Sequence, residues 1–107
     1  MSSNLTNVGF DTERVVTGPF TGIAQNLGAI LAFNPVIAIL DNQSTVSIAV
    51  VVNGVTWKTF EAGEALVLDF RANHGIAANY TISLGTQFTV IGTGGTGSFR
   101  LSILYAR

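Results

Sequence analysis

The chain has 107 residues, enough for one domain, and its five Lys and Arg and six Asp and Glu give a net charge of −1. With no basic field to neutralise phosphates, this balance excludes nucleic-acid binding by charge. Only 10% of the residues are charged, against ~25% in an average soluble domain, while 48% are hydrophobic. Since a small domain exposes much of its surface, we expect other protein chains to cover part of it.

A membrane location does not account for the apolar composition. The longest apolar run, residues 27–40, is interrupted at Asn34-Pro35 and is shorter than the ~20 residues of a spanning helix. The first ten residues have neither a basic nor an apolar region, so we expect no secretory signal. Cysteine is absent, which excludes disulfides and thiolate metal sites in this chain.

The N-terminal residues differ in pattern from the rest. Residues 1–11 are polar and aperiodic, and we expect them to form a flexible arm before a single β-sandwich domain over residues 12–107. The turn pair Gly18-Pro19 separates two short extended pieces, 13–18 and 19–23.

The remainder of the chain reads as strands and turns. Alternation of apolar and polar residues, or short apolar runs, predicts strands at 28–33, 36–40, 45–52, 55–60, 64–70, 86–91 and 98–107. Asn53-Gly54 is the strongest hairpin signal, and Glu61-Ala62-Gly63 is expected to turn the chain back once more.

This spacing predicts an all-β fold, a β-sandwich or single jelly roll of about seven to eight short antiparallel strands. Phe99, Leu101 and Ile103 are expected to face its core. The strands 36–40 and 65–68 are apolar on both faces. In a sandwich, one face of each strand is normally solvated, so we expect the outer faces of these strands to pack against a neighbouring subunit.

The segment 92–97, GTGGTG, matches the G-x-G-x-x-G fingerprint of dinucleotide-binding proteins. That fingerprint works between a strand and a helix, whereas the residues on both sides of it alternate with period two and predict strands. No lysine follows the last glycine, which excludes a Walker loop. The sequence therefore predicts a hairpin turn and no nucleotide cofactor.

No group of residues forms a catalytic or metal-binding pattern. His74 is the only histidine, and metal sites need several clustered His or Cys ligands. Glu61 and Glu64 flank one turn, where paired carboxylates either hold Ca²⁺ or are simply solvated, and no ligand-rich loop accompanies them. We expect no enzyme activity, no catalytic residue, no metal and no cofactor.

Other features leave alternatives open. Trp57 fits either a sugar-binding platform or a tryptophan of the core or an interface. Asp69 is expected to form a structural ion pair with Arg71 or with Arg100. Three Asn-x-Ser/Thr sequons are interpreted as chance occurrences in a chain rich in these residues: Asn4, Asn42 and Asn79.

From Asn34 onward the order of pieces resembles small jelly-roll virion proteins of tailed bacteriophages. Residues 34–70 are similar to their succession of a strand, an N-x-S turn, an alternating strand ending at x-G, and the pattern A-G-x-x-L-x-L-D. Residues 85–106 are similar to their closing pattern G-T-x-aromatic-x-V-x-G, then G-T-G-S and a terminal strand with tyrosine.

This resemblance implies a non-enzymatic structural protein of the virion, made in the host cytoplasm. The expected role is a capsid decoration (cement) protein that binds the major capsid protein or another virion protein and stabilises the phage head. A neck or tail-fibre module and a carbohydrate-binding β-sandwich are the alternatives. We expect a homo-oligomer, with a trimer favoured, and no nucleic-acid or membrane partner. The expected partner-binding residues are Leu5, Val8, Phe10 and Trp57.

Overall fold

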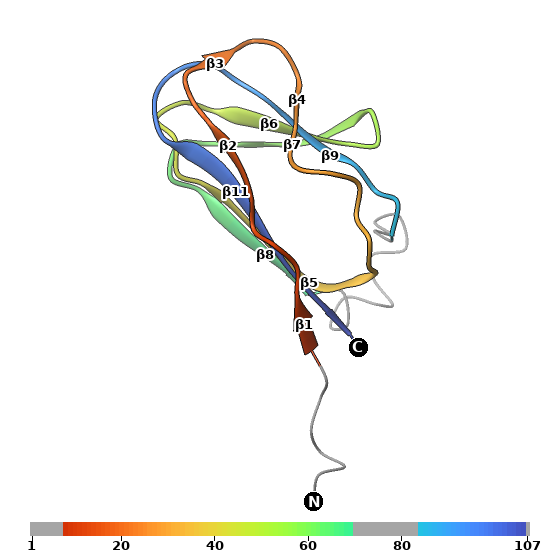
Figure 1. Cartoon of the computed structure of the whole chain (residues 1–107). Helices are drawn as coiled ribbons and strands as arrows, with labels where there is room; N and C mark the ends of the chain where they lie inside the picture. The colour runs from red at the N-terminus through yellow and green to blue at the C-terminus, as the bar shows by residue number, and fades with distance from the viewer. Residues whose placement is uncertain (1–7, 70–83, 107) are drawn as a thin grey trace, which may run out of the picture.

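The computed structural model describes residues 8–69 and 84–106, which form a sandwich of antiparallel sheets (Figure 1). Every regular element in these residues is a strand, which confirms the all-β class expected from the sequence. The strands are β1 (Val8–Phe10), β2 (Arg14–Thr17), β3 (Phe20–Thr21), β4 (Gln25–Asn26), β5 (Pro35–Asn42), β6 (Ile48–Val52), β7 (Val55–Phe60), β8 (Ala65–Asp69), β9 (Phe88–Ile91), β10 (Thr93–Gly94) and β11 (Ser98–Ala106).

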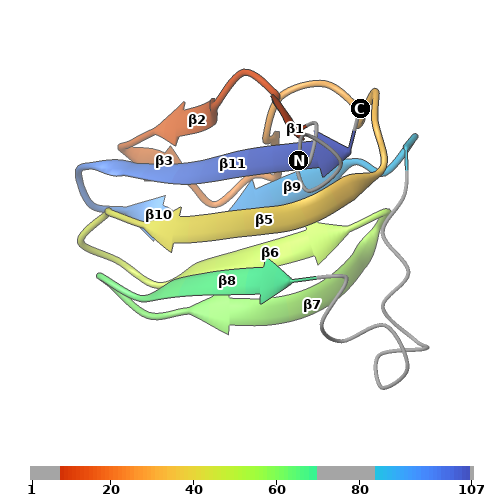
Figure 2. The ribbon, with the colours of Figure 1, turned by 90° about the horizontal axis from the view of Figure 1, so that it is seen from below.

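Two sheets face each other across the core. The first sheet has the order β1-β11-β5-β8, and β2 pairs with β11 on the same edge as β1. The second sheet has the order β4-β9-β6-β7. The short strands β10 and β3 form a separate pair. Figure 2 shows β11, β5 and β8 of the first sheet running in one layer of the sandwich.

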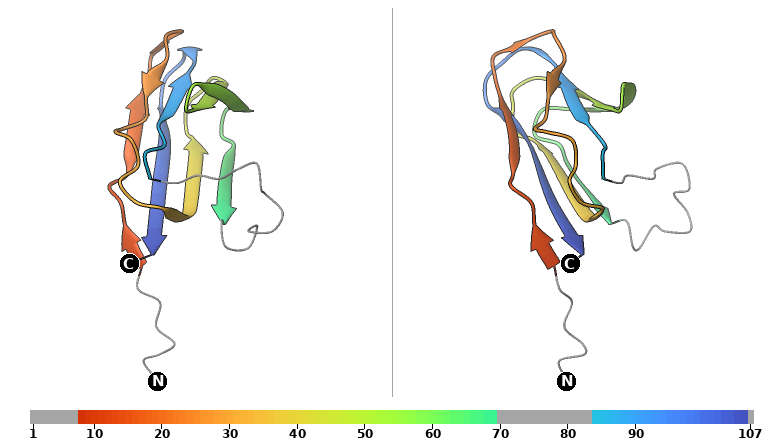
Figure 3. Two further views of the ribbon diagram at one scale, coloured as in Figure 1. Left: turned by 90° about the vertical axis from the view of Figure 1, so that its right-hand side faces the viewer. Right: turned by 45° about the vertical axis from the view of Figure 1, so that its right-hand side comes forward.

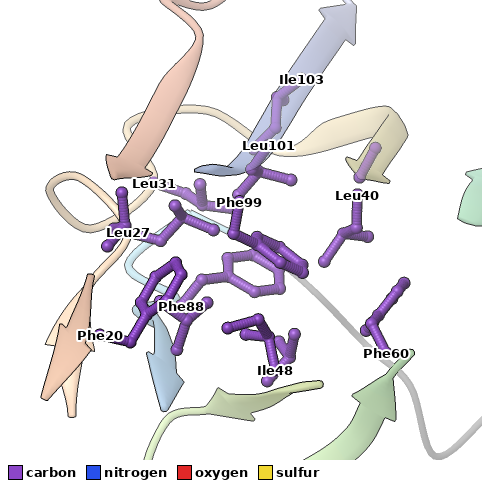
Figure 4. Close-up of a cluster of buried hydrophobic side chains, with 14 residues drawn as sticks. Phe20, Leu27, Leu31, Leu40, Ile48, Phe60, Phe88, Phe99, Leu101 and Ile103 are labelled. Carbon is purple, nitrogen blue, oxygen red and sulfur yellow. The ribbon is translucent and has the colours of Figure 1, made fainter. Parts of the chain in front are cut away.

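The core contains the side chains that alternation assigns to the inner faces of the strands. Phe99 and Leu101 of β11 are fully buried and Ile103 is 2% exposed, which confirms the expected inward face of this strand (Figure 4). The Phe99 ring meets the ring of Phe60 from β7 edge to face, with centroids 5.4 Å apart. Contacts of this kind join the two sheets.

The hairpin expected at Asn53-Gly54 is confirmed. It joins β6 to β7, which pair antiparallel in the second sheet. Both turn residues have positive φ, 49° at Asn53 and 84° at Gly54. A two-residue hairpin turn whose twist matches that of the flanking strands needs positive φ at both of its central residues.

Two other expected hairpins are wrong. The glycine-rich segment 92–97 leads from β9 in the second sheet to β11 in the first, so it is a connection between layers. Likewise Glu61-Ala62-Gly63 leads from β7 to β8, which lie in different sheets. In both places the alternating pattern correctly predicts strands, but it carries no information about which sheet the next strand joins.

The strand expected at 28–33 is also wrong. Leu27, just before this segment, is fully buried, and Leu31 within it is 2% exposed. Both belong to the main core cluster, which explains the apolar residues here. The segment is therefore a loop that covers one end of the core (Figure 3).

The N-terminal end of the described chain lies on the first sheet. β1 pairs with Leu104, Tyr105 and Ala106 of β11, so three residues of the segment expected to be an arm form a short strand. The backbone N–H of Asp11 donates to the carbonyl of Ile103 over 3.0 Å, and the Asp11 carboxylate pairs with Arg14. Residues 1–7 lie outside the described residues, and for them the arm stays a prediction.

Replacing Gly97 by alanine is expected to destabilise the fold more than the same change at Gly54. Both glycines have positive φ, 92° and 84°. A Cβ at Gly97 would collide with the carbonyl oxygen of Gln43, whereas a Cβ at Gly54 meets nothing within 4 Å. Gly54→Ala should therefore cost about 1 kcal/mol from backbone strain, and Gly97→Ala roughly 3 kcal/mol because the backbone must also move. Urea unfolding of both variants measures the difference, and equal losses would contradict the prediction.

Candidate functional site

The outer face of the first sheet carries rows in which apolar side chains are mixed with a few polar and charged ones. In β11, the residues that alternate with the buried ones are Arg100, Ser102 and Leu104. The register of the sheet places them in rows with their neighbours: Val15–Arg100–Asp41–Ala65, Ser102–Ile39–Val67 and Phe10–Leu104–Ile37–Asp69. We call these residues the outer face of the first sheet.

The apolar members of this face are accessible. Phe10 is 77% exposed and Val67 59% exposed, and they occupy opposite edges of the sheet. Ile37, Ile39 and Leu104 lie between them on the central strands and are partly exposed. Apolar side chains therefore occur on the outer face of every strand of the sheet. The sequence predicted this for β5 and β8, whose segments 36–40 and 65–68 are apolar on both faces.

The outer face of the second sheet is different in character. Its register gives the rows Thr59–Ala49–Ile91 and Thr56–Val51–Thr89–Asn26. Thr56 and Thr59 on its edge strand are exposed. Threonine suits a solvated strand face, because its hydroxyl can be hydrated while its branched carbon favours the extended backbone. The difference identifies the first sheet as the better candidate for contact with another protein.

Charged groups gather at one end of the outer face. An ion pair joins Arg100 Nη1 and Glu13 Oε1 over 2.9 Å, and Arg100 Nε donates to Ser98 Oγ. In the same row as Arg100, Asp41 Oδ2 accepts a hydrogen bond from Gln43 Nε2 over 2.6 Å. Because the Arg100–Glu13 pair is largely exposed, it contributes little to folding stability.

The residues predicted to bind a partner are dispersed. Phe10 belongs to the outer face just described, and Val8 lies two residues before it in β1. Leu5 lies outside the described residues. Trp57 is on the edge strand of the second sheet, away from this face. The structure thus brings one of the four onto the candidate surface.

Trp57 is held by the core. A register shift in the pairing of β6 with β7 leaves it as the extra residue of a bulge, since Lys58 pairs with Val50 and Thr56 with Val51. Its ring packs against the core cluster and meets Phe60 at 6.0 Å between centroids, inclined by 62°. Of the two interpretations offered by the sequence, these contacts favour a core tryptophan over a sugar platform.

The paired carboxylates are part of the connection between β7 and β8. Glu64 Oε2 pairs with Lys58 Nζ over 2.9 Å, and Glu64 Oε1 accepts from the backbone N–H of Glu61. These two interactions, the backbone one first, hold the pKa of Glu64 below its usual value. The Glu61 carboxylate accepts instead from Ser47 Oγ over 3.2 Å. Both carboxylates therefore have local structural partners.

Within residues 8–69 and 84–106 there is no group of three or more His, Cys, Asp or Glu that could hold a metal ion. The same part of the chain has no helix long and apolar enough to cross a membrane. Arg71 and His74 lie outside the described residues, and Arg100, one expected partner of Asp69, is paired with Glu13.

Of the three Asn-x-Ser/Thr sequons, only the one at Asn42 lies within the described residues. Asn42 is fully buried, so in the folded protein its side chain is inaccessible to a glycan. Asn4 and Asn79 lie outside the described residues.

Sequence reasoning did not single out Ile37, Ile39, Val67 and Leu104 as members of one surface. For Ile37, Ile39 and Val67 the signal was present, because each lies in a strand that is apolar on both faces, whereas Leu104 lies in a strand whose outward residues are otherwise polar. What the pattern lacked was the strand order, since β5, β8 and β11 are far apart in the chain and become neighbours only in the sheet.

Comparison with known proteins gives a fold and no family. No family model and no curated protein matches the chain. A solved structure described as "Bacillus endospore appendages form a novel family of disulfide-linked pili" is similar, with a TM-score of 0.50 and 16% sequence identity. The match covers 96% of this chain and 91% of that chain. At this identity the likeness shows the fold alone.

Proposed function

We propose that the chain is a non-enzymatic structural subunit of a larger protein assembly, and specifically a capsid decoration protein of a tailed bacteriophage. The observation that carries the proposal is the apolar outer face of the first sheet, from Phe10 through Leu104 and Ile37 to Val67. Contiguous apolar surface on a soluble domain marks a site of interaction with another protein. The scarcity of charge, 10% of all residues, agrees with a subunit that is covered in its assembly.

The strand order supports a single jelly roll within this fold. The strands β2-β11-β5-β8 face β4-β9-β6-β7. Along the chain, the sheet changes at every step between these eight strands (β2, β4, β5, β6, β7, β8, β9, β11) except from β6 to β7. Two facing four-stranded sheets with this alternation are the architecture of viral capsid and lectin domains. Together with the resemblance of residues 34–70 and 85–106 to phage virion proteins, this order favours a place on the capsid.

A filament subunit is the second candidate. It is favoured by the fold likeness to the Bacillus endospore appendage protein, which extends over nearly the whole length of both chains. That protein belongs to pili described as disulfide-linked. This chain contains no cysteine, so a filament that it forms could not be linked by disulfides between its residues.

The capsid role is tested on particles. Heads, tails and free filaments from the producing cells are separated on a density gradient, and each fraction is examined for peptides of the chain by mass spectrometry. We expect the chain in the head fraction. Heads freed of the chain should release DNA at a lower temperature, and adding the purified protein should restore the original release temperature.

Other locations would replace the proposal. Recovery of the chain with tails or with filaments would contradict a capsid role, and filaments would support the second candidate. Binding of the purified protein on a glycan array, with no binding to stripped heads, would favour the carbohydrate-binding alternative instead.

A further inference from the structure

Two opposite charges stand side by side on the central strands of the outer face. Arg100 of β11 and Asp41 of β5 are cross-strand partners in register. Their side chains also contact other groups: Arg100 contacts Glu13 and Ser98, and Asp41 contacts Gln43. A guanidinium has several N–H donors and a carboxylate several acceptor positions, so both side chains keep capacity for a further partner.

This arrangement is complementary to itself. Consider a two-fold axis in the plane of contact, parallel to β5 and β11 and midway between them. The rotation exchanges the positions of the two strands, so Arg100 of one copy faces Asp41 of the other, twice over. The same rotation brings Leu104 opposite Ile37, since these two residues are also cross-strand partners on the same face. Only at the edges of this row does it place an apolar residue, Phe10, opposite a charged one, Asp69.

We propose that the outer face of the first sheet binds a second copy of this chain through this two-fold axis, which makes a dimer and not the trimer that the sequence favoured. In such an isologous contact both subunits use the same patch. Two-fold symmetry of this kind is the commonest symmetry of soluble oligomers. The contact would close two charge-assisted hydrogen-bonded pairs and cover the half-exposed Leu104, Ile37 and Ile39.

The other face-to-face arrangement is less favourable. A two-fold axis across the strands would place the row of Arg100 and Asp41 over the row of Leu104 and Ile37. Charged groups would then lose water against apolar side chains without gaining a partner, which is costly. The order of charged and apolar rows therefore selects the axis parallel to the strands.

The contact is expected to be of modest strength. Sheets packed face to face twist away from each other at their edges, so the contact is centred on β5 and β11. A patch of this extent is small beside the ~800 Å² per partner of a standard interface, and we expect dissociation in roughly the micromolar range. Since the pairs at the centre are charged, higher salt should weaken the dimer.

The test uses charge reversal on the purified full chain. Arg100→Asp makes both central positions acidic, and Asp41→Arg makes both basic. Each variant alone should be monomeric in analytical ultracentrifugation at concentrations where the parent is a dimer, with the dissociation constant raised at least tenfold. An equimolar mixture of the two variants should form a heterodimer, because each acidic position then faces a basic one.

Matched variants separate the interface from effects on the fold. Val67→Lys changes an exposed residue of the same face and should also weaken the dimer, while Thr59→Arg adds charge to the outer face of the second sheet and should leave it unchanged. Circular dichroism melting checks that each variant is folded.

The result can overturn the inference independently of the capsid proposal, since no particle is involved. A monomeric parent, a trimer, or a dimer that tolerates both charge reversals would each contradict it.

Discussion

Removing the residues after Gly97 is expected to abolish cooperative folding. The deletion takes away β11, which pairs with β5 on one side and with β1 and β2 on the other. It also removes the buried side chains of Phe99, Leu101 and Ile103. Each such loss costs ~2–5 kcal/mol, so the three together are comparable to the whole ~5–15 kcal/mol that stabilises a typical domain, before the lost strand pairing is counted. Circular dichroism melting and solubility measure the effect, and a truncated chain with a cooperative transition near that of the parent would contradict it.

A graded version of this experiment separates core packing from strand pairing. Phe99→Ala keeps the backbone of β11 but leaves a cavity beside Phe60, and should cost roughly 3–5 kcal/mol. Ser102→Ala changes the opposite face of the same strand and should stay within about 0.5 kcal/mol of the parent. Urea unfolding compares the two, and similar losses would show that the inward face of β11 is assigned incorrectly.

The elements that could be predicted from the sequence are those marked by neighbouring residues alone, through regular alternation or through a specific turn pair. The alternation in β11 gives its inward face, and Asn53-Gly54 gives a hairpin because few other residue pairs accept positive φ at both positions. The strand β5 was predicted as 36–40 and extends two residues beyond Leu40, because Asn42 still pairs with Phe99. In these places local chemistry and the tertiary fold agree.

Connections between the sheets could not be predicted, because a strand looks the same in either layer. The chain leaves the second sheet after β9 and again after β7, and both times the turn residues suggested a hairpin. The outer face depends on the same missing information. Its rows join residues as distant in sequence as Phe10 and Leu104, and no local pattern contains that pairing.

Replacing the buried Asn42 is expected to cause one of the largest losses of stability among single polar substitutions. Its amide nitrogen lies within 2.9–3.0 Å of the carbonyl oxygens of Val46, Phe60 and Glu61. Its Oδ1 accepts from the hydroxyl of Ser44 over 2.6 Å. One side chain thus ties the connection after β5 to the connection after β7, at the places where the chain changes sheet.

Asn42→Ala should lower the free energy of unfolding by roughly 2–4 kcal/mol, because buried carbonyl groups lose a donor and no water replaces it. The control is Asn26→Ala, an exposed asparagine of β4 whose loss should cost about 0.5 kcal/mol or less. Urea unfolding of both variants provides the comparison. A loss at Asn42 no larger than that at Asn26 would mean that the connections after β5 and β7 do not depend on this side chain.

Asn42→Asp gives the same position a dependence on pH. The new carboxyl would sit fully buried with carbonyl oxygens around one of its oxygens, and both conditions disfavour the charged form. The N–H and hydroxyl of Ser44, which bond to the other oxygen, favour it. We expect burial and the carbonyl oxygens to prevail, so that the pKa of this carboxyl in the folded protein rises above the ordinary ~4. A carboxyl whose pKa is raised on folding destabilises the folded state least when it is protonated, that is, below the pKa that it has in the unfolded chain. We therefore expect Asn42→Asp to approach the parent's stability below about pH 4 and to lose stability as the pH rises through the raised pKa. Melting temperatures from pH 3 to 8, each referred to the parent at the same pH, measure this, and a difference that is constant across the range would show that the introduced carboxyl has escaped to solvent.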